Sequence, residues 1–143
     1  MQANATLRGI HLFVKDVKAT VAFYRRAGLE FESVSKHFAR AKSDRAALEL
    51  GSYELTRGYD PGFREPTSGG AAGFATALQI GLASREAVDA VYADLTAAGF
   101  AGHLAPIDAF WGARYAEVRD PDGNIVGFQS PVDVSKRSAP PAA

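Results

Sequence analysis

The sequence of 143 residues contains no cysteine. It therefore has no disulfide framework, no thiolate site for zinc or an iron–sulfur cluster, and no cysteine nucleophile. A chain of this length removes about two thirds of its unfolded surface from water when it folds. It therefore needs neither a metal nor a disulfide to stabilise its core.

An excess of one charge is also missing, because 16 basic and 16 acidic residues cancel to a formal net charge of zero. No run of lysine and arginine offers a binding surface for a phosphate backbone or an anionic membrane. We therefore expect neither a nucleic-acid partner nor membrane binding.

Long hydrophobic runs are absent as well. No window approaches the length of about 18 apolar residues that a membrane-spanning helix needs, and residues 1–7 lack the apolar segment of a signal peptide. This pattern predicts a cytoplasmic protein. Residues 134–143 are polar and proline-rich, so we expect a single folded domain within residues 1–133, followed by a flexible tail over 134–143.

Two halves of the sequence show the same order of predicted elements, β-α-β-β-β. In each half a helix begins after a capping residue, Asp16 or Ser84, and ends at a glycine, Gly28 or Gly99. Runs of apolar or alternating residues predict the strands. These strands span residues 7–14, 29–35, 46–50 and 52–57 in module 1 (about 7–57), and 74–83, 100–105, 111–119 and 124–130 in module 2 (about 74–131).

A constant spacing of 71 positions relates the two predicted helices: it separates Val17 from Val88 and Gly28 from Gly99. Such a spacing indicates two copies of one module, each able to curl a four-stranded sheet around a shared cavity. The sequence thus predicts an α+β fold, in which two tandem β-α-β-β-β modules form a curled mixed sheet around a cavity with the helices outside.

Residues 58–73 separate the two modules and contain five glycines and two prolines. This composition opposes a regular element. The segment is either a plain linker between the modules or a flap that covers the cavity.

Two stretches of the chain carry a family resemblance. LRGIHLFVKDVKATVAFYRRAGL at residues 7–29 and FWGARYAEVRDPDGNIVGF at residues 110–128, together with the order of elements, resemble the vicinal oxygen chelate superfamily. That superfamily includes glyoxalases, bleomycin-resistance proteins, extradiol dioxygenases and fosfomycin-resistance enzymes. The resemblance implies the fold, but it leaves the function open because one fold hosts many chemistries.

The resemblance also implies where a metal would bind. Metal-dependent members use side chains on the first strand of each module and on the last strand of the second module, usually His, His or Gln, and Glu. The corresponding positions here are Gly9, Ala77 and Gly127, the last of which replaces the glutamate of the family's DPDGNxxE pattern. None of these three side chains is a metal ligand.

Three other residues remain as possible ligands. His11 and Gln79 each lie two positions along the strand from a family ligand position, and hence on the same face of the strand. Glu54 stands where some glyoxalases carry a carboxylate. His11 is also compatible with an ordinary half-buried strand histidine, and Glu54 with a solvated strand residue. We therefore expect no metal and no other cofactor.

Aromatic residues could line the cavity. Trp111, the only tryptophan, begins a predicted strand at a place where family members commonly point a ring into the cleft. A ring there could stack on a planar ligand, although each aromatic could equally belong to the core. The carboxylates of Glu49 and Glu117 could attract a cation. The predicted ligand-binding residues are Trp111, Phe38, His11, Glu54, Gln79, Tyr115 and Arg114.

The resulting hypothesis is a metal-independent protein that binds a small molecule, as in the bleomycin-resistance branch, with an antibiotic or aromatic metabolite as ligand. The alternative is a metal-dependent lyase, isomerase or dioxygenase of the same superfamily, so the sequence leaves open whether the protein is an enzyme. We also expect a homodimer, because each sheet leaves edges that a symmetric partner can cover.

Overall fold

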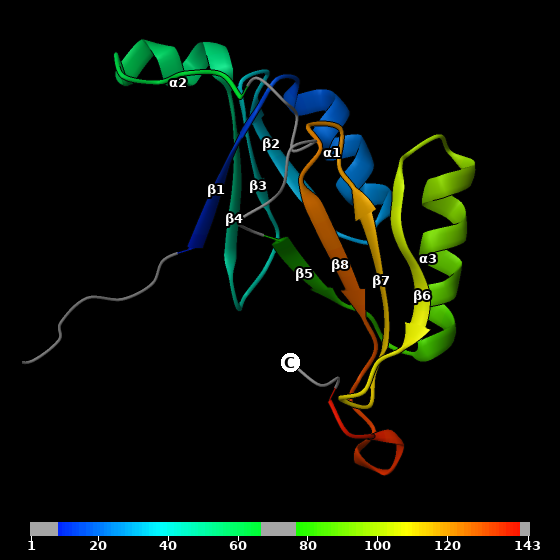
Figure 1. Cartoon of the computed structure of the whole chain (residues 1–143). Coiled ribbons are helices and arrows are strands. Elements are labelled where there is room, and N and C mark those ends of the chain that lie inside the picture. The colour runs from blue at the N-terminus through cyan, green and yellow to red at the C-terminus, as the bar shows by residue number, and fades with distance from the viewer. Residues whose placement is uncertain (1–8, 67–76, 141–143) are drawn as a thin grey trace, which may run out of the picture. The chain divides into compact units, whose positions relative to one another are not determined.

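A computed structural model describes residues 9–66 and 77–140 (Figure 1). The chain divides into two compact units, one ending at Glu65 and the other beginning at Pro66. Each unit contains one of the two predicted modules. The α+β class and the two β-α-β-β-β modules are confirmed, and each module forms its own open four-stranded mixed sheet.

The first unit has the strand order β1-β4-β3-β2. Its first strand, β1, pairs in parallel with β4, whereas the other neighbouring strands are antiparallel. The helix α1 connects β1 to β2 and packs on β3 and β4. The elements are β1 (Gly9–Val14), α1 (Val17–Arg26), β2 (Phe31–Ser35), β3 (Phe38–Ala41), β4 (Ala47–Ser52) and α2 (Tyr53–Tyr59).

Local sequence signals define α1. The Asp16 carboxylate accepts a hydrogen bond from the backbone N–H of Ala19 at 3.0 Å, as expected of an N-cap. Val17, Val21 and Tyr24 form the buried stripe of the helix, with at most 4% of each residue exposed. Gly28 follows the helix with a φ of 98°, a conformation in which only glycine is unstrained.

The end of the first module differs from the prediction. Residues 52–57 do not form a strand, because Ser52 caps the helix α2 by accepting a hydrogen bond from the Leu55 N–H at 3.0 Å. The missing strand of the module is β3, which the sequence analysis did not identify. Since α2 extends to Tyr59, the predicted linker begins later than residue 58, and its residues 67–73 lie outside the described part of the chain.

The second unit repeats the plan of the first. Its strand order is β5-β8-β7-β6, with β5 and β8 parallel, and α3 packs on β6, β7 and β8 (Figure 1). The elements are β5 (Ala77–Gly81), α3 (Arg85–Ala97), β6 (Gly102–Asp108), β7 (Arg114–Arg119), β8 (Ile125–Gln129) and the short 3₁₀ helix η1 (Val134–Lys136).

Two local predictions for this unit are confirmed. Ser84 caps α3 by accepting a hydrogen bond from the Ala87 N–H at 3.1 Å, and Gly99 follows the helix with a φ of 97°. The turn between β7 and β8 is held by the Asp120 carboxylate, which accepts hydrogen bonds from the backbone N–H groups of Asp122 and Asn124, each at 2.9 Å.

The beginning of the predicted tail has a defined structure. The backbone N–H of Asp133 donates to the carbonyl of Gly112 at 2.9 Å, and that of Ser138 donates to the carbonyl of Phe110 at 2.9 Å. Between them lies η1, and the Arg137 side chain donates to the carbonyl of Trp111 at 3.1 Å. Residues 133–138 thus contact the loop that carries Trp111.

Within residues 9–66 and 77–140, every helix is too short or too polar to cross a bilayer.

The glycine after α3 provides a direct test of the helix ending. A Cβ at Gly99 would meet no atom within 4 Å, so Gly99→Ala adds only the strain of an alanine at positive φ. We expect this variant to lose about 1–2 kcal/mol of unfolding free energy in urea denaturation. The matched control is Gly81→Ala, because a Cβ at Gly81 also meets no atom but its φ is ordinary. Equal losses of unfolding free energy in Gly99→Ala and Gly81→Ala would show that the positive φ of Gly99 does not require glycine.

Candidate functional site

The two faces of the second sheet differ in chemistry. One face is apolar: it carries Ala116, Val118, Val126 and Phe128, all fully buried. The helix α3 packs against the sheet on this side. The opposite face, here called the Tyr115 face, is defined by residues that the strand register places side by side. They are Gln79 on β5, Tyr115 and Glu117 on β7, and Gly127 and Gln129 on β8.

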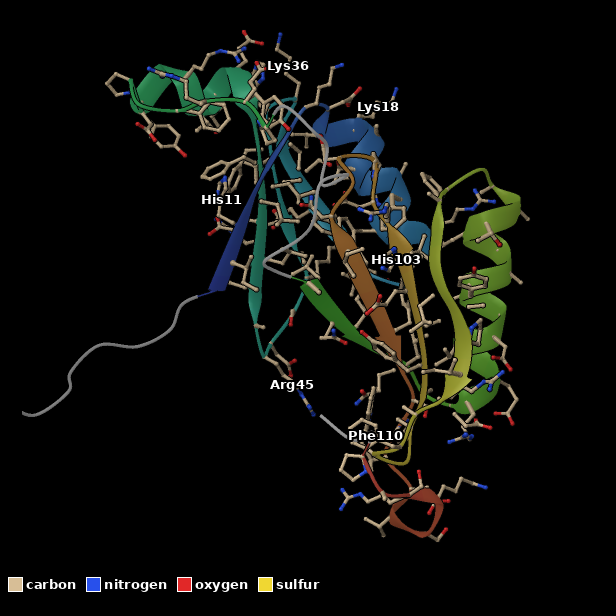
Figure 2. All side chains as sticks on the ribbon, viewed as in Figure 1. His11, Lys18, Lys36, Arg45, His103 and Phe110 are labelled. Atoms are coloured by element: carbon tan, nitrogen blue, oxygen red, sulfur yellow. The ribbon has the colours of Figure 1, made fainter. Side chains whose placement is uncertain are left out.

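A chain of hydrogen bonds crosses the Tyr115 face. The Gln79 amide donates to the Tyr115 hydroxyl at 3.2 Å, and that hydroxyl donates to a Glu117 carboxylate oxygen at 2.8 Å. The second carboxylate oxygen of Glu117 lies 3.7 Å from Nε2 of His103, which comes from β6 (Figure 2). The neutral side chains of Gln79 and Tyr115 and the carboxylate of Glu117 are therefore connected by hydrogen bonds on one face of the sheet.

Burial keeps the Tyr115 phenol protonated. Only 8% of the residue is exposed, and this burial raises the pKa of the hydroxyl above its usual value of 10.0. The hydrogen bond from Gln79 acts in the opposite direction, whereas the neighbouring Glu117 carboxylate raises the pKa further. Tyr115 is thus a hydrogen-bond donor at neutral pH rather than a base.

Trp111 is fixed at one end of this face. Its indole N–H donates to the side-chain carbonyl of Gln129 at 3.0 Å, and its ring meets the Tyr115 ring edge-on at 5.3 Å between centroids. The Phe110 ring contacts the other side at 5.1 Å. The tryptophan is half-buried, so part of an oriented aromatic surface remains accessible.

Gly127 leaves the space in which the Tyr115 hydroxyl lies. A Cβ at position 127 would be 2.6 Å from that hydroxyl and 2.7 Å from the Gln79 amide oxygen, closer than real contacts permit. A glutamate at this position would displace the hydrogen-bonded pair. The position of the family's carboxylate ligand is therefore filled by two neutral side chains.

The other metal positions of the family fit an ion no better. A Cβ at Gly9 would lie 2.3 Å from the carbonyl oxygen of Ala47, so no larger side chain fits there without moving β4. In the described part of the chain, no three His, Asp or Glu residues gather closely enough to hold a metal. The family positions Gly9, Ala77 and Gly127 thus carry no side chain that could bind a divalent ion.

Glu49 is the counterpart of Gly127 in the first unit. It lies opposite His11 in the parallel pair β1–β4, as Gly127 lies opposite Gln79 in the pair β5–β8. Its carboxylate is 3.4 Å from the Arg40 guanidinium. A carboxylate thus occupies the position that corresponds to Gly127, and its charge already has a cationic partner.

His11 and Phe38 lie together on the first sheet. The His11 ring is 5.1 Å from the Phe13 ring and 6.2 Å from the Phe38 ring (Figure 2). A Cβ at Gly51 would be 2.5 Å from Nε2 of His11, so the imidazole lies directly over this glycine. His11 therefore packs among aromatic rings.

The structure brings five of the seven predicted residues into two groups. Gln79, Trp111 and Tyr115 share the Tyr115 face of the second unit, and His11 and Phe38 share a face of the first. The other two predicted residues lie elsewhere.

Glu54 lies on the helix α2 instead of on a strand, so the strand position assumed for it in the sequence analysis is wrong. Its side chain is 73% exposed, and its carboxylate is 3.8 Å from Nδ1 of His37.

Arg114 lies on the α3 side of the second sheet, one residue from Tyr115 and therefore on the opposite face. Its guanidinium contacts Asp89 at 2.8 Å and Asp108 at 3.2 Å. Asp108 also pairs with Arg85. These contacts link α3 to β6 and β7, which is a structural role.

Gln129 was missed by the sequence analysis. It could have been identified from the period of two along β8, because it lies two residues beyond Gly127 and hence on the same face. Its partner Trp111 is 18 positions away, so the hydrogen bond itself was not predictable from local sequence.

The Asp108 ion pairs predict a pH dependence of stability. Desolvation raises the pKa of this carboxyl, but Arg114 and Arg85 outweigh it and hold the pKa below the usual 3.8. A carboxyl whose pKa is lowered by folding stabilises the folded state at any pH above its pKa in the unfolded protein. This stabilisation is lost as the pH falls through its pKa in the folded protein. We expect the urea midpoint of Asp108→Asn to fall less than that of the unmodified protein between about pH 6 and about pH 3. Asp44→Asn, in the β3–β4 loop, controls for the loss of one carboxylate, and an equal fall in all three proteins would contradict the prediction.

The space at Gly127 can be tested by a double-mutant cycle. Gly127→Ala should destabilise the protein by forcing the buried Tyr115 hydroxyl to move, and Tyr115→Phe removes that hydroxyl. We expect Gly127→Ala to lower the free energy of unfolding by less when Tyr115 is already phenylalanine. The coupling free energy between the two substitutions should be at least about 0.5 kcal/mol in urea denaturation. If the two substitutions change the free energy of unfolding additively, the Tyr115 hydroxyl does not require a glycine at position 127.

A family model supports the overall resemblance. The model described as "Glyoxalase/Bleomycin resistance protein/Dioxygenase superfamily" matches residues 6–128, which is most of the chain. No curated protein matches the sequence.

Solved structures share the fold. A glyoxalase/bleomycin resistance protein/dioxygenase family enzyme from Burkholderia phytofirmans PsJN is 22% identical, with a TM-score of 0.74 over 88% of this chain and 98% of its own. A glyoxalase-related enzyme from Fulvimarina pelagi is 20% identical, with a TM-score of 0.72 over 96% and 99%. A lactoylglutathione lyase from Agrobacterium tumefaciens is 20% identical, with a TM-score of 0.62 over 90% and 96%. At these identities the likeness establishes the fold alone.

Proposed function

This chain belongs to the Glyoxalase/Bleomycin resistance protein/Dioxygenase superfamily, and we propose that within it the protein is a metal-independent binder of a small planar molecule. An antibiotic or another aromatic metabolite is the ligand class, as in the bleomycin-resistance branch. The Tyr115 face is the proposed contact surface.

The observation that carries this proposal is the close packing around Gly127. The family's glutamate is absent there, and the Tyr115 hydroxyl and the Gln79 amide fill the space that its side chain would need. A metal-dependent isomerase or dioxygenase relies on the ion as a Lewis acid at this position. The side chains present supply hydrogen bonds instead, which suit recognition of a polar group on a ligand.

Trp111 supports the choice of a planar ligand. Its ring is oriented by Gln129 and by the edge of Tyr115, so little side-chain entropy would be lost when a flat molecule stacks on it. A ligand that also extends toward Glu117 would meet a carboxylate whose side chain is 18% exposed. An aromatic surface next to a few polar groups is typical of a small-molecule site.

A homodimer is part of the proposal. The strands β1 and β2 form the edges of the first sheet, and β1 carries the exposed side chains of Ile10 and Phe13. A symmetric partner would remove such edges and apolar side chains from water.

Metal content and ligand binding together test the function. We expect protein purified without chelator to contain no stoichiometric transition metal, and an aromatic antibiotic or metabolite from a thermal-shift screen to stabilise it whether or not chelator is added. Near-stoichiometric iron, manganese, nickel or zinc, whose removal abolishes ligand binding, would overturn the proposal.

Trp111 gives the sharper test with any ligand found in that screen. Stacking should quench or shift the emission of this single tryptophan, and Trp111→Ala should weaken binding by about 1–3 kcal/mol. Tyr59→Ala on α2, which also removes an exposed aromatic ring, should bind normally. A folded Trp111→Ala protein with unchanged affinity would exclude the stacking role. A stability loss of about 3–5 kcal/mol would instead identify Trp111 as a core residue.

A further inference from the structure

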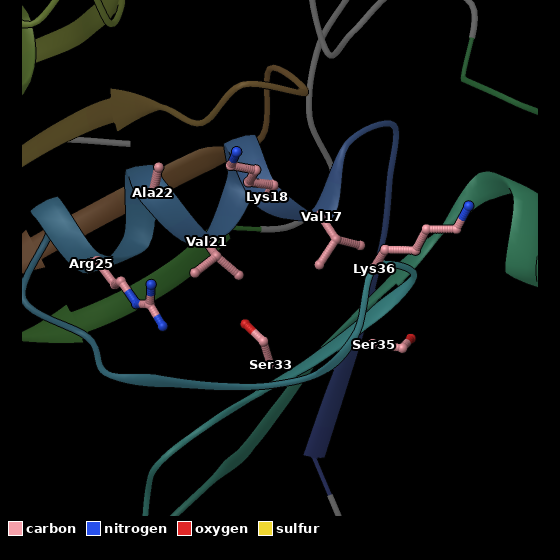
Figure 3. A pocket seen from close by; sticks show the side chains of 8 residues that line it. All are labelled: Val17, Lys18, Val21, Ala22, Arg25, Ser33, Ser35 and Lys36. Atoms are coloured by element: carbon pink, nitrogen blue, oxygen red, sulfur yellow. The ribbon is translucent and has the colours of Figure 1, made fainter.

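The first unit contains a second concave site that the proposed function does not use. A groove of about 430 Å³ lies between α1 and β2 and reaches the turn that follows β2 (Figure 3). It belongs to the side of the sheet that α1 covers, whereas His11 and Phe38 lie on the other side. Its lining residues are Val17, Lys18, Val21, Ala22, Arg25, Ser33, Ser35 and Lys36.

The base of the groove is apolar. Val17 and Val21 are each 4% exposed, and they come from the same stripe of α1 as the neighbouring core residue Tyr24. Figure 3 shows both valines on the side of α1 that faces Ser33. A short hydrocarbon or aromatic body could therefore lie against them and bury its surface.

The charged residues of the groove are all cationic. Lys18, Arg25 and Lys36 line it, and no aspartate or glutamate does so. In the described part of the chain, neither Lys18 nor Lys36 forms an ion pair. The groove thus has a positive potential that a neutral ligand would not use.

Nearby carboxylates already have other partners. The Asp16 carboxylate caps α1 by accepting a hydrogen bond from Ala19, and Glu30 is 3.9 Å from Lys42. Glu32 lies opposite Arg40 in the β2–β3 register. These carboxylates keep their charge, but none of them lines the groove.

The groove also offers oriented donors. One Arg25 nitrogen donates to the carbonyl of Phe31 at 3.1 Å, which fixes the guanidinium while leaving its other N–H groups available. The Ser35 hydroxyl oxygen accepts a hydrogen bond from the His37 N–H at 3.1 Å, so its own hydrogen can donate outward. In Figure 3 the Arg25 guanidinium and the Ser33 hydroxyl lie on the Val21 side of α1, whereas both lysine side chains extend outward from the rim.

We propose that this groove binds a small organic phosphate: the phosphoryl group contacts Arg25 and Ser33, and its apolar body lies beside Val21 toward Val17. A doubly charged oxyanion matches a fixed guanidinium and a hydroxyl, with two long, movable lysines at the rim, better than a single carboxylate does. The site is separate from the Tyr115 face, so its ligand is independent of the function proposed above.

Phenyl phosphate is a suitable probe because it combines a phosphoryl group with a flat apolar body. In an NMR titration of the full chain, it should shift the backbone amide signals of Val21, Ser33 and Lys36 in a saturable manner. Inorganic phosphate should bind the same residues more weakly, because it lacks the apolar body, and phenol should not shift them. Equal affinities for phenyl phosphate and inorganic phosphate, or shifts confined to other residues, would overturn the proposal.

Charge variants separate this site from general attraction of anions. Lys18→Gln and Lys36→Gln should each weaken phenyl phosphate binding by up to about fivefold, as expected for an exposed charge pair. Arg45→Gln, which removes an exposed cation at the β3–β4 loop, should leave it unchanged (Figure 2). Ser33→Asp retains every cation but adds a carboxylate to the groove, and it should abolish the shifts. Unchanged binding by folded Ser33→Asp protein, or equal losses in Lys18→Gln and Arg45→Gln, would contradict the assignment.

Discussion

The missing side chain at Gly127 is the constraint on which the polar face of the second sheet depends. Because nothing extends from this position, the Tyr115 hydroxyl can approach β8 and accept a hydrogen bond from Gln79 while donating one to Glu117. Burial of the hydroxyl would be unfavourable without these partners. A single backbone position on β8 thus determines the arrangement of side chains from β5 and β7.

In the proposed function, hydrogen bonds take the role that a metal ion has in metal-dependent members of the family. A divalent metal requires several donors that converge on one point, whereas the Tyr115 face presents a row of groups that already satisfy one another. Trp111 extends the row with an aromatic ring that Gln129 holds in place. Such a preorganised surface favours binding, because few side chains must be ordered when a ligand arrives.

The two modules show how one scaffold carries different chemistry. Equivalent positions hold His11 and Glu49 in the first sheet but Gln79 and Gly127 in the second. In both sheets this pair lies between the first and last strands of the module, which are parallel. What differs is the side chains, so the fold alone does not determine what the protein binds.

The sequence by itself determined the features that depend on neighbouring residues. The caps at Asp16 and Ser84, the glycines that end both helices and the turn at Asp120 all act within a few positions, and runs of apolar or alternating residues predicted the order of the elements. The prediction failed at residues 53–57, which were expected to continue a strand but form a helix that the Ser52 hydroxyl caps. Only the tertiary structure decided which side chains meet, because Gln79 and Tyr115 are 36 positions apart and no local rule relates them.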